Sequence, residues 1–365
     1  MKLDKKRTVH ILLLAVAFGL ALSFRLIRLG TYPLGDMEAE IALQALAAAQ
    51  KSRVSFGSFM SVVGLTGIDF FLFSSGNFLA RFWTAFLGAG VVFVPFFFRK
   101  KLGDWPTILA SLALAISPDM VGLSRIVGSP MMALVCLLLA LGLVYNQKPV
   151  LSGGMLAMGL MSGRVFWLGL IILGMSGLIS RWIFKENHIL ADFSITDQKH
   201  FWIRFGLSFI ATLLIIGTVF FLAPSGLSGV FSGLISFVEG FGEGYTSPFF
   251  LLPLSLVVYA LPAVIFGIWG SLRGILLKSE VDLFLLVWWV LGLVILFLYP
   301  GSNPADMIWV TFPLWILAAR VVSFAWHLPD EGHLVMIITS AVVFLLFAFM
   351  FLALRSLGNQ VYTQE

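Results

Sequence analysis

The chain has 365 residues, of which 60% are hydrophobic and only 11% charged, with a net charge of +5 and a mean hydropathy of +1.02. A soluble domain of this length needs far more polar surface, so the composition predicts an all-α, polytopic membrane protein. The positive charge does not indicate a nucleic-acid partner, because basic residues in membrane proteins mainly set topology. The single cysteine, Cys136, excludes an internal disulfide and a multi-cysteine metal site.

Apolar runs long enough to cross a bilayer, about 20 residues each, recur along the whole chain. They predict about eleven spans in one integral-membrane domain, near 9–29, 78–98, 105–123, 130–146, 150–162, 165–182, 203–222, 249–270, 282–299, 307–326 and 334–354. Within this domain (1–365) we divide the chain into a core at 9–180, a cytoplasmic connector at 181–202, C-terminal spans at 203–354 and a tail at 355–365.

The basic residues predict the orientation of the chain. Lys2, Lys5 and Lys6 precede the first span, which has no convincing cleavage site, so we expect an uncleaved span and a cytoplasmic N-terminus. The cluster Arg99-Lys100-Lys101 then falls inside, as the positive-inside rule expects. The acids fall outside, namely Asp36, Glu38, Glu40, Asp69, Asp119, Glu239, Glu243 and Asp306. The protein is therefore expected in the cell membrane with its acids on the extracytoplasmic face.

The densest group of acids follows the first span. Asp36, Glu38 and Glu40 come directly after a Pro33-Leu34-Gly35 turn and begin a helical run that ends near Gln50. They lie in a long outer loop, about 30–77, which we expect to carry short amphipathic helices. Either these carboxylates work in a site, or they stabilise the helix N-terminus by about 0.3–1 kcal/mol each, with Asp36 as the N-cap.

Arginines at the outer ends of spans offer candidate anion ligands. Arg81 and Arg125 stand at the outer ends of the second and third spans, where each either binds a lipid phosphate or snorkels to the interface. An arginine at mid-bilayer costs on the order of 3 kcal/mol, so Arg164 is a further phosphate candidate if it faces an interior cavity. Arg25 and Arg28 are expected to be interfacial anchors.

Several short motifs occur in a fixed order over roughly residues 10–180. Phe24-Arg25-Leu26 leads to Pro33-Leu34 and Asp36-Met37-Glu38-Ala39, followed by residues 77–83, 99–103, 116–118 and 124–125, with a weaker match at 312–318. Together they resemble the GT-C-type, polyprenyl-phosphate-dependent glycosyltransferases, in particular the protein O-mannosyltransferase-like and aminoarabinose-transferase-like branch. That superfamily commonly has adjacent Asp-Glu, whereas this chain has Asp36-Met37-Glu38, so the register of the catalytic acid is open.

The resemblance implies inverting transfer of a sugar from a polyprenyl-phosphate donor to a hydroxyl of a lipid, glycan or protein acceptor. Such a reaction needs a carboxylate to accept the acceptor proton and cations to stabilise the departing phosphate. Asp36 is the candidate base, while Glu38 either orients the acceptor, binds a cation or is itself the base. The donor-phosphate ligands would be Arg81, Arg125 and Arg164.

No resident cofactor and no histidine metal site are expected, since the five histidines fall on the inner side. A divalent cation held by carboxylates stays an open alternative, with candidate ligands Asp36, Glu38, Asp119 and Glu239. Two other functions compete with the enzyme: a transporter or flippase of lipid-linked saccharides, and an inactive GT-C-like protein that binds partners. Charges gathered at one face and the lack of a repeat favour the enzyme over the transporter, whereas Met37 keeps the inactive protein in consideration.

Overall fold

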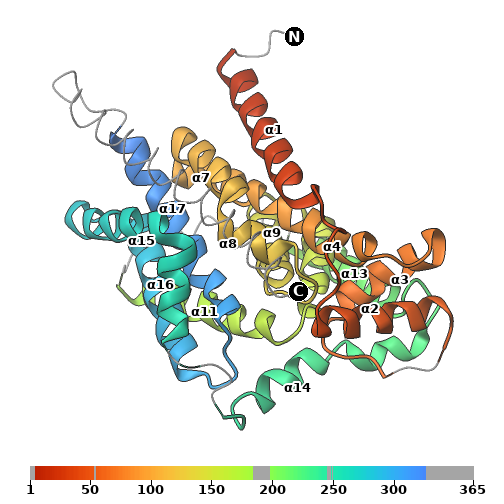
Figure 1. The fold of residues 1–365 in the computed structure, drawn as a ribbon. Coiled ribbons are helices and arrows are strands. Elements are labelled where there is room, and N and C mark those ends of the chain that lie inside the picture. Colours follow the sequence, from red (N-terminus) through yellow and green to blue (C-terminus); the bar gives the residue numbers. More distant parts are fainter. Residues whose placement is uncertain (1–4, 53–54, 184–197, 245–247, 249, 326–365) are drawn as a thin grey trace.

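The computed structural model describes residues 5–52, 55–183, 198–244, 248 and 250–325, and every regular element in this part of the chain is a helix (Figure 1). This confirms the predicted all-α class. The helices are α1 (Lys5–Leu26), α2 (Asp36–Ala49), α3 (Met60–Phe73), α4 (Asn77–Ala89), η1 (Gly90–Phe93), α5 (Val94–Phe97), α6 (Arg99–Leu102), α7 (Asp104–Ile116), α8 (Pro118–Ser124), α9 (Met131–Tyr145), α10 (Pro149–Leu160), α11 (Arg164–Ile183), α13 (Gln198–Gly217), η2 (Pro224–Gly229), α14 (Ser232–Glu239), α15 (Leu251–Leu277), α16 (Glu280–Leu298), η3 (Pro304–Met307) and α17 (Ile308–Ala325).

Long apolar helices confirm a multi-pass membrane protein. Among the described residues, 7 helices are long and apolar enough to cross a membrane, or 8 if the bent pair α7–α8 forms one span. The predicted spans 130–146 and 150–162 correspond to the shorter helices α9 and α10, of 15 and 12 residues. The predicted span 334–354 lies outside the described residues. The total of eleven therefore stays a prediction.

The centre of the bundle is α17, almost every residue of which is buried. It packs against α7, α15 and α16, and the larger hydrophobic core forms around it together with α9 and α11. Glycines allow this close packing, as small residues often do between membrane helices. Gly267 and Gly270 of α15 lie against Leu314 and Leu317 of α17, and Gly169 of α11 lies under the Trp309 ring.

A second hydrophobic core lies under α2 and α3, on the other side of α9 from α15, α16 and α17 (Figure 1). Short helices are present in the first outer loop, as predicted, namely α2 and α3, but α3 is not amphipathic in its burial. Its residues 60–67 are all buried, because α2, α4 and α13 pack around it. Gly64 of α3 comes so close to α13 that an added Cβ would lie 2.3 Å from the Ile216 carbonyl oxygen.

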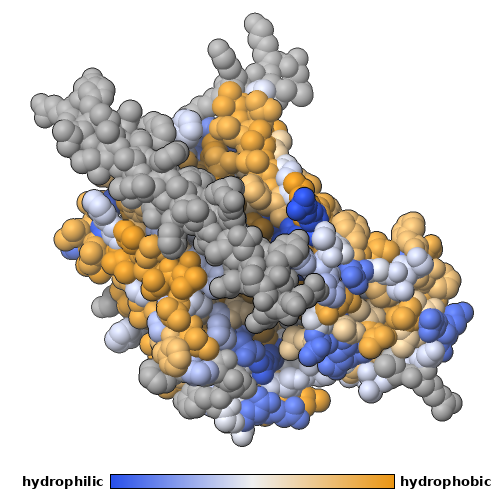
Figure 2. Space-filling view, viewed as in Figure 1, coloured by the Kyte–Doolittle hydropathy of each residue, from blue (hydrophilic) through white to orange (hydrophobic). Residues whose placement is uncertain are grey.

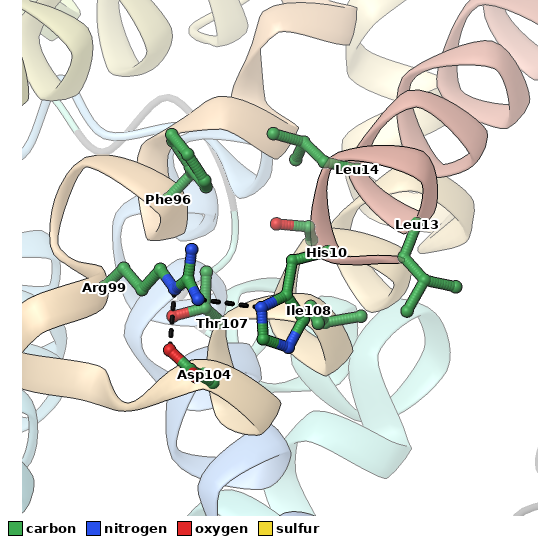
Figure 3. A pocket seen from close by; sticks show the side chains of 9 residues that line it. His10, Leu13, Leu14, Phe96, Arg99, Asp104, Thr107 and Ile108 are labelled. Atoms are coloured by element: carbon green, nitrogen blue, oxygen red, sulfur yellow. Dashed lines mark hydrogen bonds and ion pairs between the residues drawn. The ribbon is translucent and has the colours of Figure 1, made fainter. Parts of the chain in front are cut away.

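The two ends of α1 define two ends of the bundle. Near its start, His10 Nδ1 lies 2.7 Å from Nη2 of Arg99, whose Nε donates to Asp104 at 2.7 Å (Figure 3). Near its end, Leu29 accepts a hydrogen bond from Arg81. The 22 residues of α1 measure about 33 Å, enough to cross a bilayer. We call the end that carries Arg99–Lys101 the basic end, and the end that carries Asp36, Glu38 and Glu40 the acidic end.

The flanks of the bundle expose large apolar side chains. Hydrophobic residues cover long stretches of the face seen in Figure 2, and hydrophilic residues form smaller groups between them. Trp182 of α11, Leu276 of α15 and Leu298 of α16 are among the most exposed apolar side chains. Such a surface is stable in lipid and would be costly in water.

Candidate active site

A buried ion pair between α2 and α4 organises the acidic end. Arg81 Nε donates to Glu38 Oε1 at 2.9 Å, and Arg81 Nη2 donates to Glu38 Oε2 at 2.5 Å. The same guanidinium donates to the carbonyls of Leu29 (3.3 Å), Tyr32 (2.9 Å) and Pro33 (2.9 Å). Arg81 thus uses all of its five N–H donors and fixes the whole connection from α1 to α2. We call Arg81 and Glu38 the hub.

Glu38 is equally saturated. Besides Arg81, its Oε1 accepts from the backbone N–H of Val127 at 2.9 Å and its Oε2 from that of Gly35 at 3.1 Å. These bonds fill the roughly four lone-pair sites of a carboxylate. Burial by itself raises the pKa of Glu38, but the hydrogen bonds from Arg81, Val127 and Gly35 outweigh it and hold the pKa below its usual 4.5. Glu38 is therefore an ionised anchor for three segments.

Asp36 is the contrasting carboxylate. It is the first residue of α2 and exposed, and among the described residues its side chain has no hydrogen-bond or ion-pair partner. The expectation that Asp36 is the N-cap is wrong. Gly35, in an extended conformation (φ −68°, ψ 167°), takes that place, and Glu38 rather than Asp36 satisfies its N–H. Asp36 is consequently an uncommitted carboxylate directly beside the hub.

Arg125 reaches the same end from α8. Its Nη1 donates to the carbonyls of Phe24 (2.8 Å) and Ile27 (2.9 Å), and its Nη2 donates to that of Arg28 (3.3 Å). These are carbonyls at and just beyond the C-terminus of α1, where helical partners run out and a cation is favourable. Among the described residues its Nε–H has no partner. Arg125 therefore caps α1 while keeping donor capacity for another anion.

Arg164, the first residue of α11, lies in a neighbouring group. Its Nη1 is 3.7 Å from Glu243 Oε2, an ion pair too long for a hydrogen bond. The start of α11 adjoins the hub through Phe59, whose ring packs near Gly163 on one side and Gly128, next to Val127, on the other. The structure thus brings Glu38, Arg81 and the segment that follows Arg125 into direct contact, and it places Arg164 in a second group beside them.

The break between α7 and α8 explains a buried arginine that the sequence did not indicate. The two helices are bent by 54°, and Pro118 has no N–H to offer the carbonyl of Leu114. Arg25 fills this gap by donating to Leu114 at 3.1 Å and to Ala115 at 2.8 Å. The expected interfacial anchor Arg25 is therefore fully buried, whereas Arg28 is exposed.

Asp119 follows the same break. Both of its carboxylate oxygens are buried near Ser117, Thr311 and Trp315. Asp119 is also close enough to Arg25 to interact with it electrostatically. Sequence reasoning missed this pairing, although the Ser117-Pro118 break, which frees carbonyls for a donor, was visible. Across the described residues, no group of three or more His, Cys, Asp or Glu is arranged to hold a metal ion.

This bundle has the same fold as solved structures of ArnT and of the oligosaccharyltransferase AglB. ArnT from Cupriavidus metallidurans bound to undecaprenyl phosphate matches with a TM-score of 0.59 and 16% identity over 92% of this chain and 63% of that one. Its apo structure gives a TM-score of 0.62 and 18% identity over 93% and 64%. The oligosaccharyltransferase AglB from Archaeoglobus fulgidus, in complex with an inhibitory peptide and a dolichol-phosphate, gives 0.58 and 17% over 95% and 56%.

The chain spans less than two thirds of the length of these solved structures. No sequence-family profile matches the chain, and no curated protein sequence matches it either. The solved structures therefore confirm the resemblance inferred from the short motifs, at the level of the fold.

Proposed function

We propose that this chain is a membrane glycosyltransferase that moves a sugar from a polyprenyl-phosphate donor to an acceptor hydroxyl at its acidic end. In this proposal the acidic end faces the extracytoplasmic side, and the N-terminus is cytoplasmic. The observation that carries the proposal is the uncommitted carboxylate of Asp36, held beside a saturated Glu38–Arg81 hub in a GT-C fold. Lipid phosphates bound to ArnT and AglB support a donor of this class.

The residues take separate roles in the reaction. The acceptor oxygen attacks the anomeric carbon and forms the new C–O bond, while its proton passes to Asp36. The bond between the anomeric carbon and the phosphate oxygen breaks, and the electron pair leaves with the polyprenyl phosphate, so the configuration inverts. Arg125 and Arg164, which keep donor capacity, stabilise the departing phosphate. Arg81 and Glu38 have no hydrogen-bonding capacity left for a substrate, so their role is to position α2 and Asp36.

A transfer assay tests the proposal. Protein purified in detergent is given radiolabelled polyprenyl-phosphate sugars and cell-envelope acceptors, with Mg²⁺ and, separately, with EDTA. Asp36→Asn should lower the rate by about 10²–10⁴, the usual contribution of general base catalysis. Glu40→Gln is the matched control, because Glu40 is an exposed carboxylate one turn further along α2. Equal rates for Asp36→Asn and the wild type would overturn the role of Asp36.

The second candidate function is an inactive protein that binds the lipid-linked donor or another partner. It is favoured by Met37, whose side chain is 59% exposed directly before the saturated Glu38. If Glu38 corresponds to the superfamily's glutamate, Met37 stands where the aspartate would be. Wild-type protein that binds donor and never transfers sugar, together with transfer by Met37→Asp, would establish this candidate. Transfer by the wild type that depends on Asp36 would exclude it.

A further inference from the structure

The basic half of the bundle contains an apolar cavity that the proposed reaction does not use. It has a volume of about 320 Å³ and lies between α5, α6, α9, α11, α16 and α17. Leu138, Leu141, Leu173, Phe284 and Trp288 are among its lining residues. A Cβ added to Gly174 or Gly177, which also line it, would meet no atom within 4 Å.

The chemistry of this cavity selects an apolar occupant. Its walls are almost entirely hydrocarbon and aromatic, and a dry apolar cavity of about 150 Å³ already binds benzene rather than water. Lys101 of α6 is the only charged residue among those described that line it, and it belongs to the basic end. An apolar chamber with a cation at the membrane-surface end suits an amphiphile with an anionic head.

We propose that this cavity holds an acyl chain of an anionic glycerophospholipid from the leaflet at the basic end, with its phosphate near Lys101. The proposed function places the phosphate of the sugar donor at the acidic end, about 33 Å away along α1, so on that function an anionic head near Lys101 belongs to a different lipid. The site is thus distinct from the reaction centre, and its existence does not depend on the transferase activity.

Photocrosslinking tests the occupant directly. The full chain carries benzoyl-phenylalanine either at Leu173, which lines the cavity, or at Leu178, which is 69% exposed on the same helix. Each protein is placed in nanodiscs of phosphatidylcholine and phosphatidylglycerol, irradiated, and its adducts are identified by mass spectrometry. Position 173 should give phosphatidylglycerol adducts about fivefold above the nanodisc composition, the preference expected of one lysine at a membrane surface. Position 178 should follow the composition.

Two variants and one control distinguish the contribution of the lipid head group from that of the acyl chain. Lys101→Gln should abolish the enrichment at position 173, while Lys100→Gln, an exposed neighbour that does not line the cavity, should keep it. Gly174→Leu should fill the cavity and remove the adducts without unfolding the protein, because the added side chain enters open space. Circular dichroism and thermal unfolding verify that each variant is folded.

Other occupants would overturn the proposal. Adducts at position 173 to residues 326–365 of this chain, to a second copy, or to added polyprenyl phosphate would each identify a different ligand. Adducts that match the nanodisc composition at both positions would show that the cavity is ordinary lipid-facing surface. Enrichment that survives Lys101→Gln would remove the assigned role of that lysine.

Discussion

Arg81 of α4 holds Glu38 of α2 through two hydrogen bonds, at 2.9 and 2.5 Å, in a pair that leaves neither side chain spare capacity. Glu38 and Arg81 are 43 residues apart in the sequence, and their contact joins α2 to α4. It also joins Val127 and the α1–α2 connection, so four segments meet at one point. The hub fixes the start of α2 and therefore the position of Asp36, although the Asp36 side chain does not contact the hub.

Removing one partner of the hub should destabilise the protein strongly. Glu38→Gln leaves Arg81 as a buried cation without its counterion, which costs about 3–5 kcal/mol of unfolding free energy. Arg81→Lys should cost nearly as much, because lysine cannot make the paired, planar contact. Thermal or denaturant unfolding in detergent measures the effect. Arg28→Gln is the control, since Arg28 is exposed, and equal stabilities for Glu38→Gln and Arg28→Gln would contradict the hub.

The unfolding free energy should also depend on pH, because Glu38 titrates at a lower pH in the folded protein than in the unfolded chain. Its folded-state pKa lies below the usual 4.5, so its stabilising contribution is complete above pH 4.5 and is lost as the pH falls through the lowered value. The melting temperature of the wild type should therefore fall on acidification in that range. The same scan on Glu38→Gln should be flatter. A wild-type curve with the slope of the variant would show that Glu38 is not held in its charged form.

Two glycines of α11 offer a matched test of packing. A Cβ at Gly169 would come within 2.0 Å of the Trp309 ring, whereas a Cβ at Gly174 meets nothing within 4 Å. Gly169→Ala should lower the unfolding free energy by about 1–3 kcal/mol, the usual cost of overpacking. Gly174→Ala should be close to neutral. Similar melting temperatures for the two variants would mean that α11 and α17 are not in this contact.

Arg25 should be essential to the break between α7 and α8. Arg25→Leu removes the donors to Leu114 and Ala115, and it removes a cation that interacts electrostatically with Asp119. We expect a loss of about 1–3 kcal/mol for each buried carbonyl that is left without its donor. Asp119→Asn should restore part of this loss in the double variant, because it removes the uncompensated charge. Additive losses would show that Arg25 and Asp119 do not interact.

Cysteine labelling checks the proposed orientation. The native Cys136 is fully buried, so its background with a membrane-impermeant maleimide should be low. Glu40→Cys at the acidic end and Lys100→Cys at the basic end, both at exposed positions, should label from opposite sides of sealed cells or vesicles. Position 40 should react from outside. Labelling of position 40 only after the membrane is permeabilised would reverse the orientation and exclude an extracytoplasmic site.

The general architecture could be predicted from the sequence because lipid imposes a simple rule on it. The lengths of the apolar runs, and the charged residues between them, predict the positions of six helices well: α1, α4, α11, α15, α16 and α17. They locate α9 and α10 less well, since these helices are too short to meet the rule. The two helices pack against one another, and α10 also packs against α13. The burial of α3 depends on neighbours that lie far away in the chain.

The candidate site was predictable in its residue types and less so in its pairings. Asp36, Glu38, Arg81 and Arg125 stood out because charge beside a span is rare. Nothing local shows that Glu38 and Arg81 saturate each other, or that Arg25 turns inward, because these bonds join elements 43 to 90 residues apart. The N-cap preference favoured Asp36, but tertiary contacts of Glu38 decided the start of α2.

Arg81 grips the α1–α2 connection only through the carbonyls of Leu29, Tyr32 and Pro33, which every amino acid possesses. Arg81 therefore makes no demand on the side chains of this connection, although Leu29 is buried and a Cβ at Gly30 would lie 2.9 Å from Phe78. Homologues with the same connection should retain the arginine and the glutamate together, while the exposed positions Thr31 and Pro33 diversify. Loss of one member of the pair in a lineage should coincide with loss of the other.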